Sequence, residues 1–152
     1  MGLLNAGKVC LFSEISGVIT LNGEPAAGAE LTRTANLNKD KVDYTTTDDS
    51  GHFKMPAVFQ RTVTQFLPQE FVAKQEIYVS YQGTQYRMWS GVKRKPEENV
   101  ESRGEPLVVH CELRLEEENY KRIDGSPIFS LCTWNAEPDP PFEQPIFDTG
   151  EQ

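Results

Sequence analysis

The sequence predicts an all-β fold. No long stretch places apolar residues at i, i+3, i+4 and i+7, whereas short runs rich in β-branched and aromatic residues recur and end in Gly, Asn, Asp or Pro. The 152 residues have the length of one ordinary domain, and eight Phe, five Tyr and two Trp supply material for a compact core. We therefore expect one function on one core.

The first predicted unit is a strand over residues 15–21 that ends in a turn at Asn22-Gly23. This pair suits the two positive-φ positions of a type I′ turn. The chain continues over 24–34, where Pro25 blocks continued pairing at the start. The alternation that follows puts Ala29, Leu31 and Arg33 on one face, and Glu30, Thr32 and Thr34 on the other.

A second hairpin is predicted from residues 42–47 and 52–56. Between these segments the side chain of Asp48 can cap the turn, and Gly51 can take the left-handed conformation. The same stretch, Asp48 to Gly51, is acidic, but it lacks the ligand spacing of a calcium-binding EF-hand loop. Turn capping is therefore the preferred interpretation.

A third hairpin is predicted from residues 76–81 and 84–89 around Gln82-Gly83. A further strand is expected over 107–113, and its continuous apolar start predicts burial on both faces or a place at the centre of a sheet. In the hairpin, alternation puts Ile77, Val79 and Tyr81 on one face, and Gln85, Arg87 and Trp89 in one row against Tyr86 and Met88.

The remaining segments are less regular. Residues 1–14 are an N-terminal extension or a first strand. Residues 57–75 are too apolar for a free loop and either pack across the fold or form one more strand, whereas 93–106 are predicted to be a solvent loop. Residues 116–152 are an acidic C-terminal extension with an added strand over 127–134.

Charge is distributed unevenly along the chain. The net charge is −8, yet residues 1–96 carry nine acidic and eleven basic side chains, and residues 97–152 carry fourteen acidic and four basic ones. The last third therefore holds a net charge of −10. Residues 136–152 contain four prolines and five acids, so they are extended or disordered unless something holds them. This acidity argues against binding to nucleic acid or to an anionic membrane, although solubility alone also explains it.

The N-terminus lacks the features of a signal peptide, and no apolar run reaches the length of a membrane span, so we expect a cytoplasmic protein. Periplasmic action stays open as an alternative. The three cysteines, Cys10, Cys111 and Cys132, show no metal-binding spacing. We expect reduced, buried thiols, or one bridge and one thiol if the protein works in an oxidising compartment.

Several of these motifs form one pattern: Gly17-Val18-Ile19, Asn22 to Pro25, Gly28 to Leu31, and Thr46 to Phe53. The pattern resembles the bacterial carboxypeptidase-regulatory-like domains, which belong to the transthyretin-like (prealbumin-like) β-sandwiches. The resemblance covers roughly residues 15–113, and a domain over 15–115 follows from it. It implies a Greek-key sandwich of about seven strands, used as a structural or binding module.

Enzyme chemistry finds little support in the sequence. Adjacent residues of a strand point to opposite faces, so His110 cannot orient Cys111 as a nucleophile, although His110 with Cys10 or Cys132 stays open. The hydrolases among transthyretin-like proteins end in Tyr-Arg-Gly-Ser, which this chain lacks. We expect no catalytic residue, no cofactor and no metal.

The leading functional hypothesis is a non-catalytic module that binds a basic protein partner. In its most concrete form, the chain is an immunity or antidote protein, or an adaptor, that binds and neutralises a protein toxin or effector. The toxin or effector could belong to a contact-dependent secretion system. Aromatic side chains within an acidic rim suit a binding hot spot. Alternatively, the tail folds back on its own sandwich and covers an edge strand. The predicted partner-binding residues are Trp134, Glu137, Asp139, Phe142, Glu143, Ile146, Phe147 and Asp148.

Two other hypotheses are kept. One is a carbohydrate- or surface-binding accessory module that uses the aromatic hairpin residues Tyr78, Tyr81, Tyr86 and Trp89, although such a set is also what cross-strand packing requires. The other is an unrecognised hydrolase built on His52, His110 and a cysteine.

Overall fold

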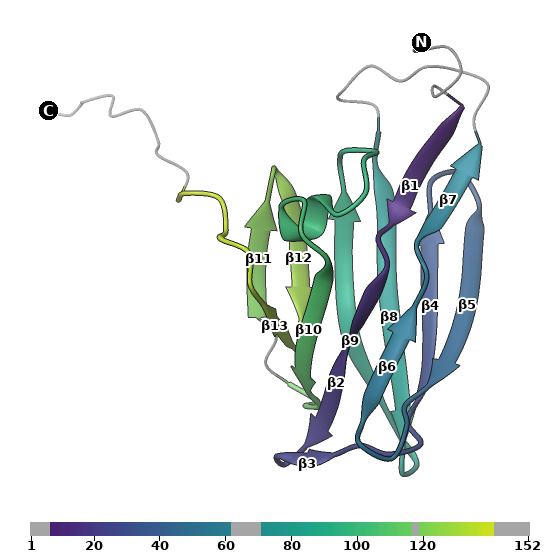
Figure 1. Cartoon of the computed structure of the whole chain (residues 1–152), viewed down its shortest axis with the longest axis vertical. Helices are drawn as coiled ribbons and strands as arrows, with labels where there is room; N and C mark the ends of the chain where they lie inside the picture. Colours follow the sequence, from purple (N-terminus) through teal and green to yellow (C-terminus); the bar gives the residue numbers. More distant parts are fainter. Residues whose placement is uncertain (1–6, 62–70, 117–118, 142–152) are drawn as a thin grey trace, which may run out of the picture.

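The computed structural model describes residues 7–61, 71–116 and 119–141, and it confirms an all-β sandwich. Thirteen strands are present in these ranges, rather than about seven. One layer is a six-stranded sheet in the order β11-β12-β9-β8-β4-β5. The other layer is a five-stranded sheet in the order β13-β10-β2-β3, in which β6 also pairs with β2. In Figure 1, β1 and β7 continue the lines of β2 and β6 as a two-stranded sheet.

The strand bounds are as follows. In the six-stranded sheet they are β4 (Glu30–Asn36), β5 (Asp40–Thr46), β8 (Ala73–Tyr81), β9 (Thr84–Lys93), β11 (Asn119–Ile123) and β12 (Ser126–Ser130). In the other layer they are β1 (Lys8–Phe12), β2 (Ile15–Leu21), β3 (Glu24–Pro25), β6 (His52–Met55), β7 (Val58–Arg61), β10 (Leu107–Glu112) and β13 (Cys132–Trp134). Apolar side chains from both layers form one core between them.

The first predicted unit is confirmed. Asn22 and Gly23 both have positive φ, at 54° and 81°, and β3 pairs with β2 over only two residues before the chain leaves for the other layer. The alternation of β4 holds as well, because Leu31 and Arg33 are fully buried. Burial of the Arg33 guanidinium is compensated by two hydrogen bonds to the Asp43 carboxylate, at 2.9 and 2.6 Å.

The second predicted hairpin is wrong, although its turn is right. The Asp48 carboxylate accepts hydrogen bonds from the backbone N–H groups of Ser50 and His52, both at 2.9 Å, and Gly51 has a φ of 81°. The strands that flank this turn do not pair with each other, because β5 pairs with β4 and β6 pairs with β2. The turn therefore connects the two layers of the sandwich.

The third hairpin is confirmed, but the predicted row of Gln85, Arg87 and Trp89 on one face of it is wrong. The register places Ile77 opposite Trp89 and Tyr78 opposite Arg87, so a bulge inserts Met88 as an extra residue in β9. Met88 and Trp89 are both fully buried, and Trp89 does not share the outward row with Arg87. The bulge explains the difference, because one extra residue reverses the alternation beyond it.

The predicted solvent loop is also wrong in part. Its middle forms a 3₁₀ helix, η2 (Val100–Ser102), whose three residues are buried. The Glu101 carboxylate accepts hydrogen bonds from the Ser13 backbone N–H and hydroxyl, at 3.1 and 2.6 Å, and from the Gln75 amide at 2.8 Å. This buried network attaches the loop to β8 and to the junction between β1 and β2.

Strand β10 lies at the centre of its sheet, which confirms one of the two expectations for this strand. It pairs in parallel with β2 on one side and antiparallel with β13 on the other. Burial on both faces is wrong, because Val108 and His110 face solvent. Of the apolar segment 57–75, residues 58–61 form β7 and Phe71 is buried, whereas 62–70 lie outside the described residues.

The C-terminal extension builds both layers of the sandwich. The predicted strand over 127–134 is two strands, since β12 pairs with β9 in one sheet and β13 pairs with β10 in the other. Between them, the backbone N–H of Leu131 donates to the Met88 carbonyl at 2.9 Å and its carbonyl accepts from the Glu112 N–H at 3.1 Å. We call residues 126–134 the strap, because they join the two sheets along one side of the sandwich.

Candidate functional site

The predicted partner-binding residues begin with Trp134, which packs against the sandwich rather than projecting from it. Its ring lies 5.0 Å from that of Trp89, and its indole N–H donates to the Glu101 carbonyl at 3.0 Å. The Lys121 ammonium covers the other side, 4.3 Å from the ring centre. Trp134 is therefore an internal anchor that attaches the strap to the core.

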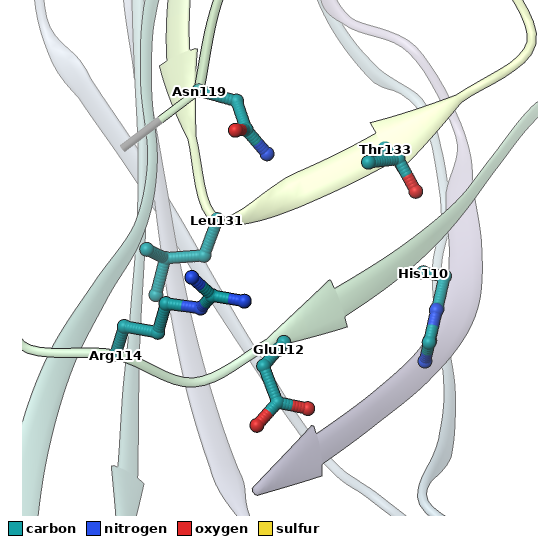
Figure 2. Close-up of a pocket in the computed structure, with 6 residues that line it drawn as sticks. All are labelled: His110, Glu112, Arg114, Asn119, Leu131 and Thr133. Carbon is teal, nitrogen blue, oxygen red and sulfur yellow. The ribbon is translucent and has the colours of Figure 1, made fainter. Parts of the chain in front are cut away.

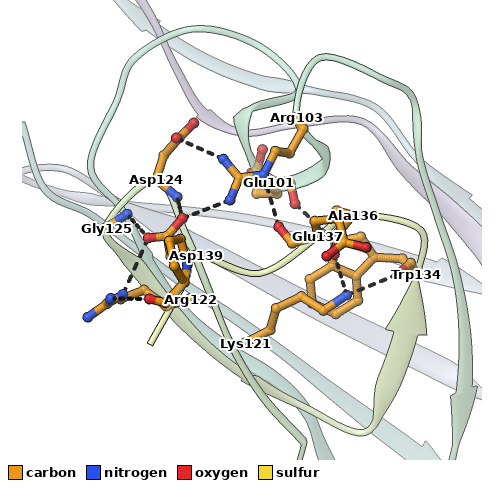
Figure 3. Close-up of polar contacts among 11 residues, drawn as sticks. Glu101, Arg103, Lys121, Arg122, Asp124, Gly125, Trp134, Ala136, Glu137 and Asp139 are labelled. Carbon is orange, nitrogen blue, oxygen red and sulfur yellow. Dashed lines mark hydrogen bonds and ion pairs between the residues drawn. The ribbon is translucent and has the colours of Figure 1, made fainter. Parts of the chain in front are cut away.

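Asp139 is also held by the protein's own side chains. Figure 3 shows its carboxylate between two guanidinium groups, with Arg103 Nη2 at 2.7 Å and Arg122 Nε at 3.3 Å. The backbone N–H groups of Asp124 and Gly125 each donate to it at 2.8 Å. We call these five residues the clasp.

The electrostatics of the clasp follow from these contacts. Partial burial by itself would raise the pKa of Asp139, but the Gly125 N–H, the Arg103 guanidinium and the Asp124 N–H together lower it to about 2. The carboxylate is thus ionised across the neutral range, and its charge is compensated within the protein.

Further contacts fasten the same segment. Lys121 Nζ donates to the carbonyls of Trp134 and Ala136, at 3.0 and 2.9 Å, and Arg103 Nε donates to the Glu137 carbonyl at 2.9 Å. The described part of the tail is therefore folded back on the sandwich, as the alternative reading of the tail expected. The Glu137 side chain is exposed. Phe142, Glu143, Ile146, Phe147 and Asp148 lie outside the described residues.

Lys121 and the two clasp arginines were missed as site residues. They are three of only four basic side chains in the last third of the chain. Their isolation within an acidic segment is the sequence signal from which internal ion pairs could have been predicted.

The aromatic hairpin does not present the platform that the carbohydrate hypothesis requires. Tyr86 and Trp89 are buried, and Tyr81 packs against the core. Only Tyr78 lies on the outer face of the six-stranded sheet, in a row that runs through Thr32 to Tyr44, which is 72% exposed.

The cysteines differ from the first expectation. Cys111 and Cys132 form a disulfide, and Cys10 is the remaining thiol, so the expectation of three reduced thiols is wrong and the alternative of one bridge holds. The two bridged residues lie directly opposite each other on β10 and β13. This register, which the sequence alone does not reveal, brings them together.

The described cysteines and His52 each have other contacts in the structure. Cys111 and Cys132 are consumed by the bridge, and burial raises the pKa of the Cys10 thiol, whose sulfur lies 3.9 Å from the Ser13 hydroxyl. Within the described residues, no group of three or more His, Cys, Asp or Glu side chains is placed to hold a metal ion. His52 is exposed at the start of β6, 3.8 Å from the Asp48 carboxylate.

A polar cavity of about 370 Å³ opens on the outward face of β10 and β13, opposite the buried bridge. As Figure 2 shows, His110 and Glu112 project from β10, Thr133 from β13, and Arg114 from the chain after β10. The Glu112 carboxylate accepts hydrogen bonds from the Thr20 hydroxyl and from the N–H groups of Asn22 and Gly23, and these bonds lower its pKa. Glu112 therefore fastens the first turn, and the cavity is lined by both hydrogen-bond donors and acceptors.

No helix in the described ranges has both the length and the apolar character needed to cross a membrane. Comparison with curated proteins and with solved structures gave no match. A family model, that of the domain of unknown function DUF6795, matches residues 15–116, which is more than half of the chain. The match ends before β11, so β11 to β13 and the Asp139 end of the clasp lie beyond it. On this match, the chain belongs to the DUF6795 family.

Proposed function

We propose that this chain is a non-catalytic module that binds a basic protein partner, most concretely an immunity or antidote protein, or an adaptor, that neutralises a protein toxin or effector. A toxin of a contact-dependent secretion system is the partner class that we favour. One observation carries the proposal: three of the four cations of the acidic last third, Arg103, Lys121 and Arg122, bind groups of the protein itself, while many of its carboxylates face solvent.

The contacts behind this observation are specific. Arg103 and Arg122 bind Asp139, and Lys121 binds the carbonyls of the folded-back tail. Glu105 and Glu137 are exposed, and the Glu137 carboxylate also interacts electrostatically with the Lys121 ammonium. Glu97, Glu98 and Glu116 are exposed as well, although the cations Arg94 and Lys95 precede the first two. Arg103 and Arg114 are exposed as well, but acidic side chains outnumber basic ones by fourteen to four in residues 97–152, so the outward field of this region is negative.

Such a surface suits association with a cationic protein. Clustered carboxylates accelerate the encounter with a basic partner and select against acidic ones, and the effect weakens as salt rises. The clasp also fixes the place from which the chain continues, because Arg122 Nη2 donates to the Pro140 carbonyl at 3.3 Å. Beyond that point the sequence carries Glu143, Asp148 and Glu151 with no Lys or Arg.

The test is a pull-down from a lysate of the source organism with three chains: the full chain, a chain that ends at Pro141, and a Glu105→Gln/Glu137→Gln double variant. All three keep the clasp. We expect the full chain to recover a basic protein at low salt and the other two chains to recover less of it, and this difference should shrink as salt is raised. A Glu24→Gln/Glu30→Gln variant, which removes two exposed carboxylates elsewhere, is the matched control and should bind like the full chain. Equal recovery by all four chains, or no partner for any of them, contradicts the proposal.

The bridge bears on where the protein acts. A buried disulfide persists in oxidising compartments and is rare in a cytoplasm, so it favours the periplasmic alternative over the cytoplasmic expectation. A periplasmic site of action also fits neutralisation of a toxin delivered from a neighbouring cell. The relationship to transthyretin-like sandwiches stays a prediction.

A carbohydrate- or surface-binding module is the second candidate, now on a different pair of aromatics. Tyr44 and Tyr78 share one row on the outer face of the six-stranded sheet, and tyrosine faces of this kind stack on sugar rings. Retention on insoluble chitin, cellulose and peptidoglycan that is lost in Tyr44→Ala would support this candidate. Equal retention of Tyr44→Ala and the unchanged chain would reject it.

A further inference from the structure

The Cys111–Cys132 bridge attaches the strap to β10. Strand β13 has three residues, and among the described residues its only ladder partner is β10. An edge strand this short contributes few hydrogen bonds of its own, so its attachment depends on what flanks it. The bridge at Cys132 secures its beginning.

The other end of the same segment is secured without a covalent bond. Trp134 packs on Trp89, and five residues later Asp139 enters the clasp with Arg103 and Arg122. The segment from Cys132 to Asp139 is thus fastened twice, by a disulfide at one end and by an ion-pair network at the other.

Burial determines how a reductant reaches the bridge. Cys111 and Cys132 are both within 1% of full burial. Thiol–disulfide exchange requires a thiolate to approach one of the sulfur atoms directly. In the closed molecule that approach is blocked, so exchange has to wait until β13 separates from β10.

We propose that the Cys111–Cys132 disulfide is a redox latch on the strap, and that the Asp139 clasp gates its reduction. When the clasp and β13 open, one thiolate of a dithiol reductant attacks a bridge sulfur and its second thiol completes the exchange. The bridge takes up two electrons and two protons to give two cysteine thiols, and the dithiol becomes a disulfide. Oxidation by a disulfide of the same chemical class reverses the step and locks the strap. This inference goes beyond the proposed function and does not rest on it.

The first test measures the rate of bridge reduction in the full, folded chain. Excess dithiothreitol is added under native conditions, new thiols are alkylated at intervals, and the product is counted by mass spectrometry. Asp139→Asn weakens the clasp without touching either cysteine, and we expect roughly tenfold faster reduction because opening becomes more frequent. Asp49→Asn, an exposed turn residue, is the control and should reduce at the unchanged rate. Equal rates for Asp139→Asn and the unchanged chain overturn the gate.

The second test measures what reduction does to the strap. Amide hydrogen exchange is compared between the oxidised chain, the reduced chain and a Cys111→Ser/Cys132→Ser variant. We expect exchange over residues 126–136 to become at least about tenfold faster without the bridge, while the β8–β9 hairpin keeps its protection and reports that the sandwich is folded. Unchanged exchange in the strap overturns the latch, and so does loss of protection in both regions together, because the bridge would then support the whole fold.

Discussion

The clasp makes a quantitative prediction about stability. Asp139→Asn keeps the size of the side chain and removes the charge that faces Arg103 and Arg122. The variant leaves two guanidinium groups with a weaker acceptor, and it weakens the hydrogen bonds from the N–H groups of Asp124 and Gly125. The loss should therefore exceed that of an ordinary surface ion pair.

Its size follows from the pKa of Asp139, which falls from 3.8 to about 2 in the folded protein. Each pKa unit corresponds to about 1.4 kcal/mol, so ionisation of Asp139 contributes at most about 2 kcal/mol at neutral pH, discounted somewhat because the side chain is 16% exposed. Since the folded pKa is the lower one, this contribution is fully present above about pH 5 and is lost as the pH falls through 4 towards 2. About half of it should remain at pH 3.

The assay is urea unfolding of the unchanged chain and of Asp139→Asn at pH 7 and at pH 3, with the bridge intact. We expect a difference in unfolding free energy of up to about 2 kcal/mol at pH 7, equivalent to about 4–8 °C in Tm, and about half of that at pH 3. Asp49→Asn should match the unchanged chain at both pH values. A difference below about 0.5 kcal/mol at pH 7, or one that does not shrink at pH 3, would refute the role assigned to the clasp.

Three other perturbations have defined outcomes in the same unfolding assay. Gly17→Ala should lower the unfolding free energy by about 3 kcal/mol or more, because an added Cβ would lie 1.9 Å from the Val109 carbonyl oxygen, where β2 and β10 run in parallel. The control Ser16→Ala should be close to neutral, and equal effects of the two variants would show that the strands are not this close. Glu101→Ala should lower the unfolding free energy by about 3 kcal/mol, because it removes the acceptor of three buried hydrogen bonds. The exposed control Glu105→Ala should have little effect, and a neutral Glu101→Ala would contradict the buried network. Under oxidising conditions, the variant with both bridge cysteines replaced by serine should be about 3 kcal/mol less stable than the unchanged chain. Once dithiothreitol has reduced the unchanged chain, the two should differ little. A difference that persists under reduction would point to packing instead of the bridge.

Local chemistry made much of the fold predictable. The turns at Asn22-Gly23 and Gln82-Gly83 require positive φ, and the residues that supply it are visible in the sequence. Alternation likewise predicted the buried face of β4. Neither signal shows which layer a strand joins, and this is why the turn at Asp48 was assigned to a hairpin although it connects the two sheets.

Long-range relationships account for what the sequence did not reveal. The bulge at Met88 changes the face of Trp89 and is set by the partner strand, and the bridge depends on a register that brings β10 opposite β13. The clasp joins Arg103 to Asp139 across 36 positions of sequence. At the candidate site, the charge asymmetry pointed to the acidic last third of the chain, but it did not distinguish carboxylates held inside the protein from those that face solvent.

The proposed function is tested most directly by the affinity of the recovered partner for a variant with four fewer negative charges: Glu105→Gln, Glu137→Gln, Glu143→Gln and Asp148→Asn. None of these four carboxylates belongs to the clasp, so the sandwich should keep its stability. Titration calorimetry at low and at physiological salt should show binding at least about tenfold weaker than that of the unchanged chain, with a smaller dependence on salt. Equal affinity and equal salt dependence would contradict a function carried by the acidic last third of the chain.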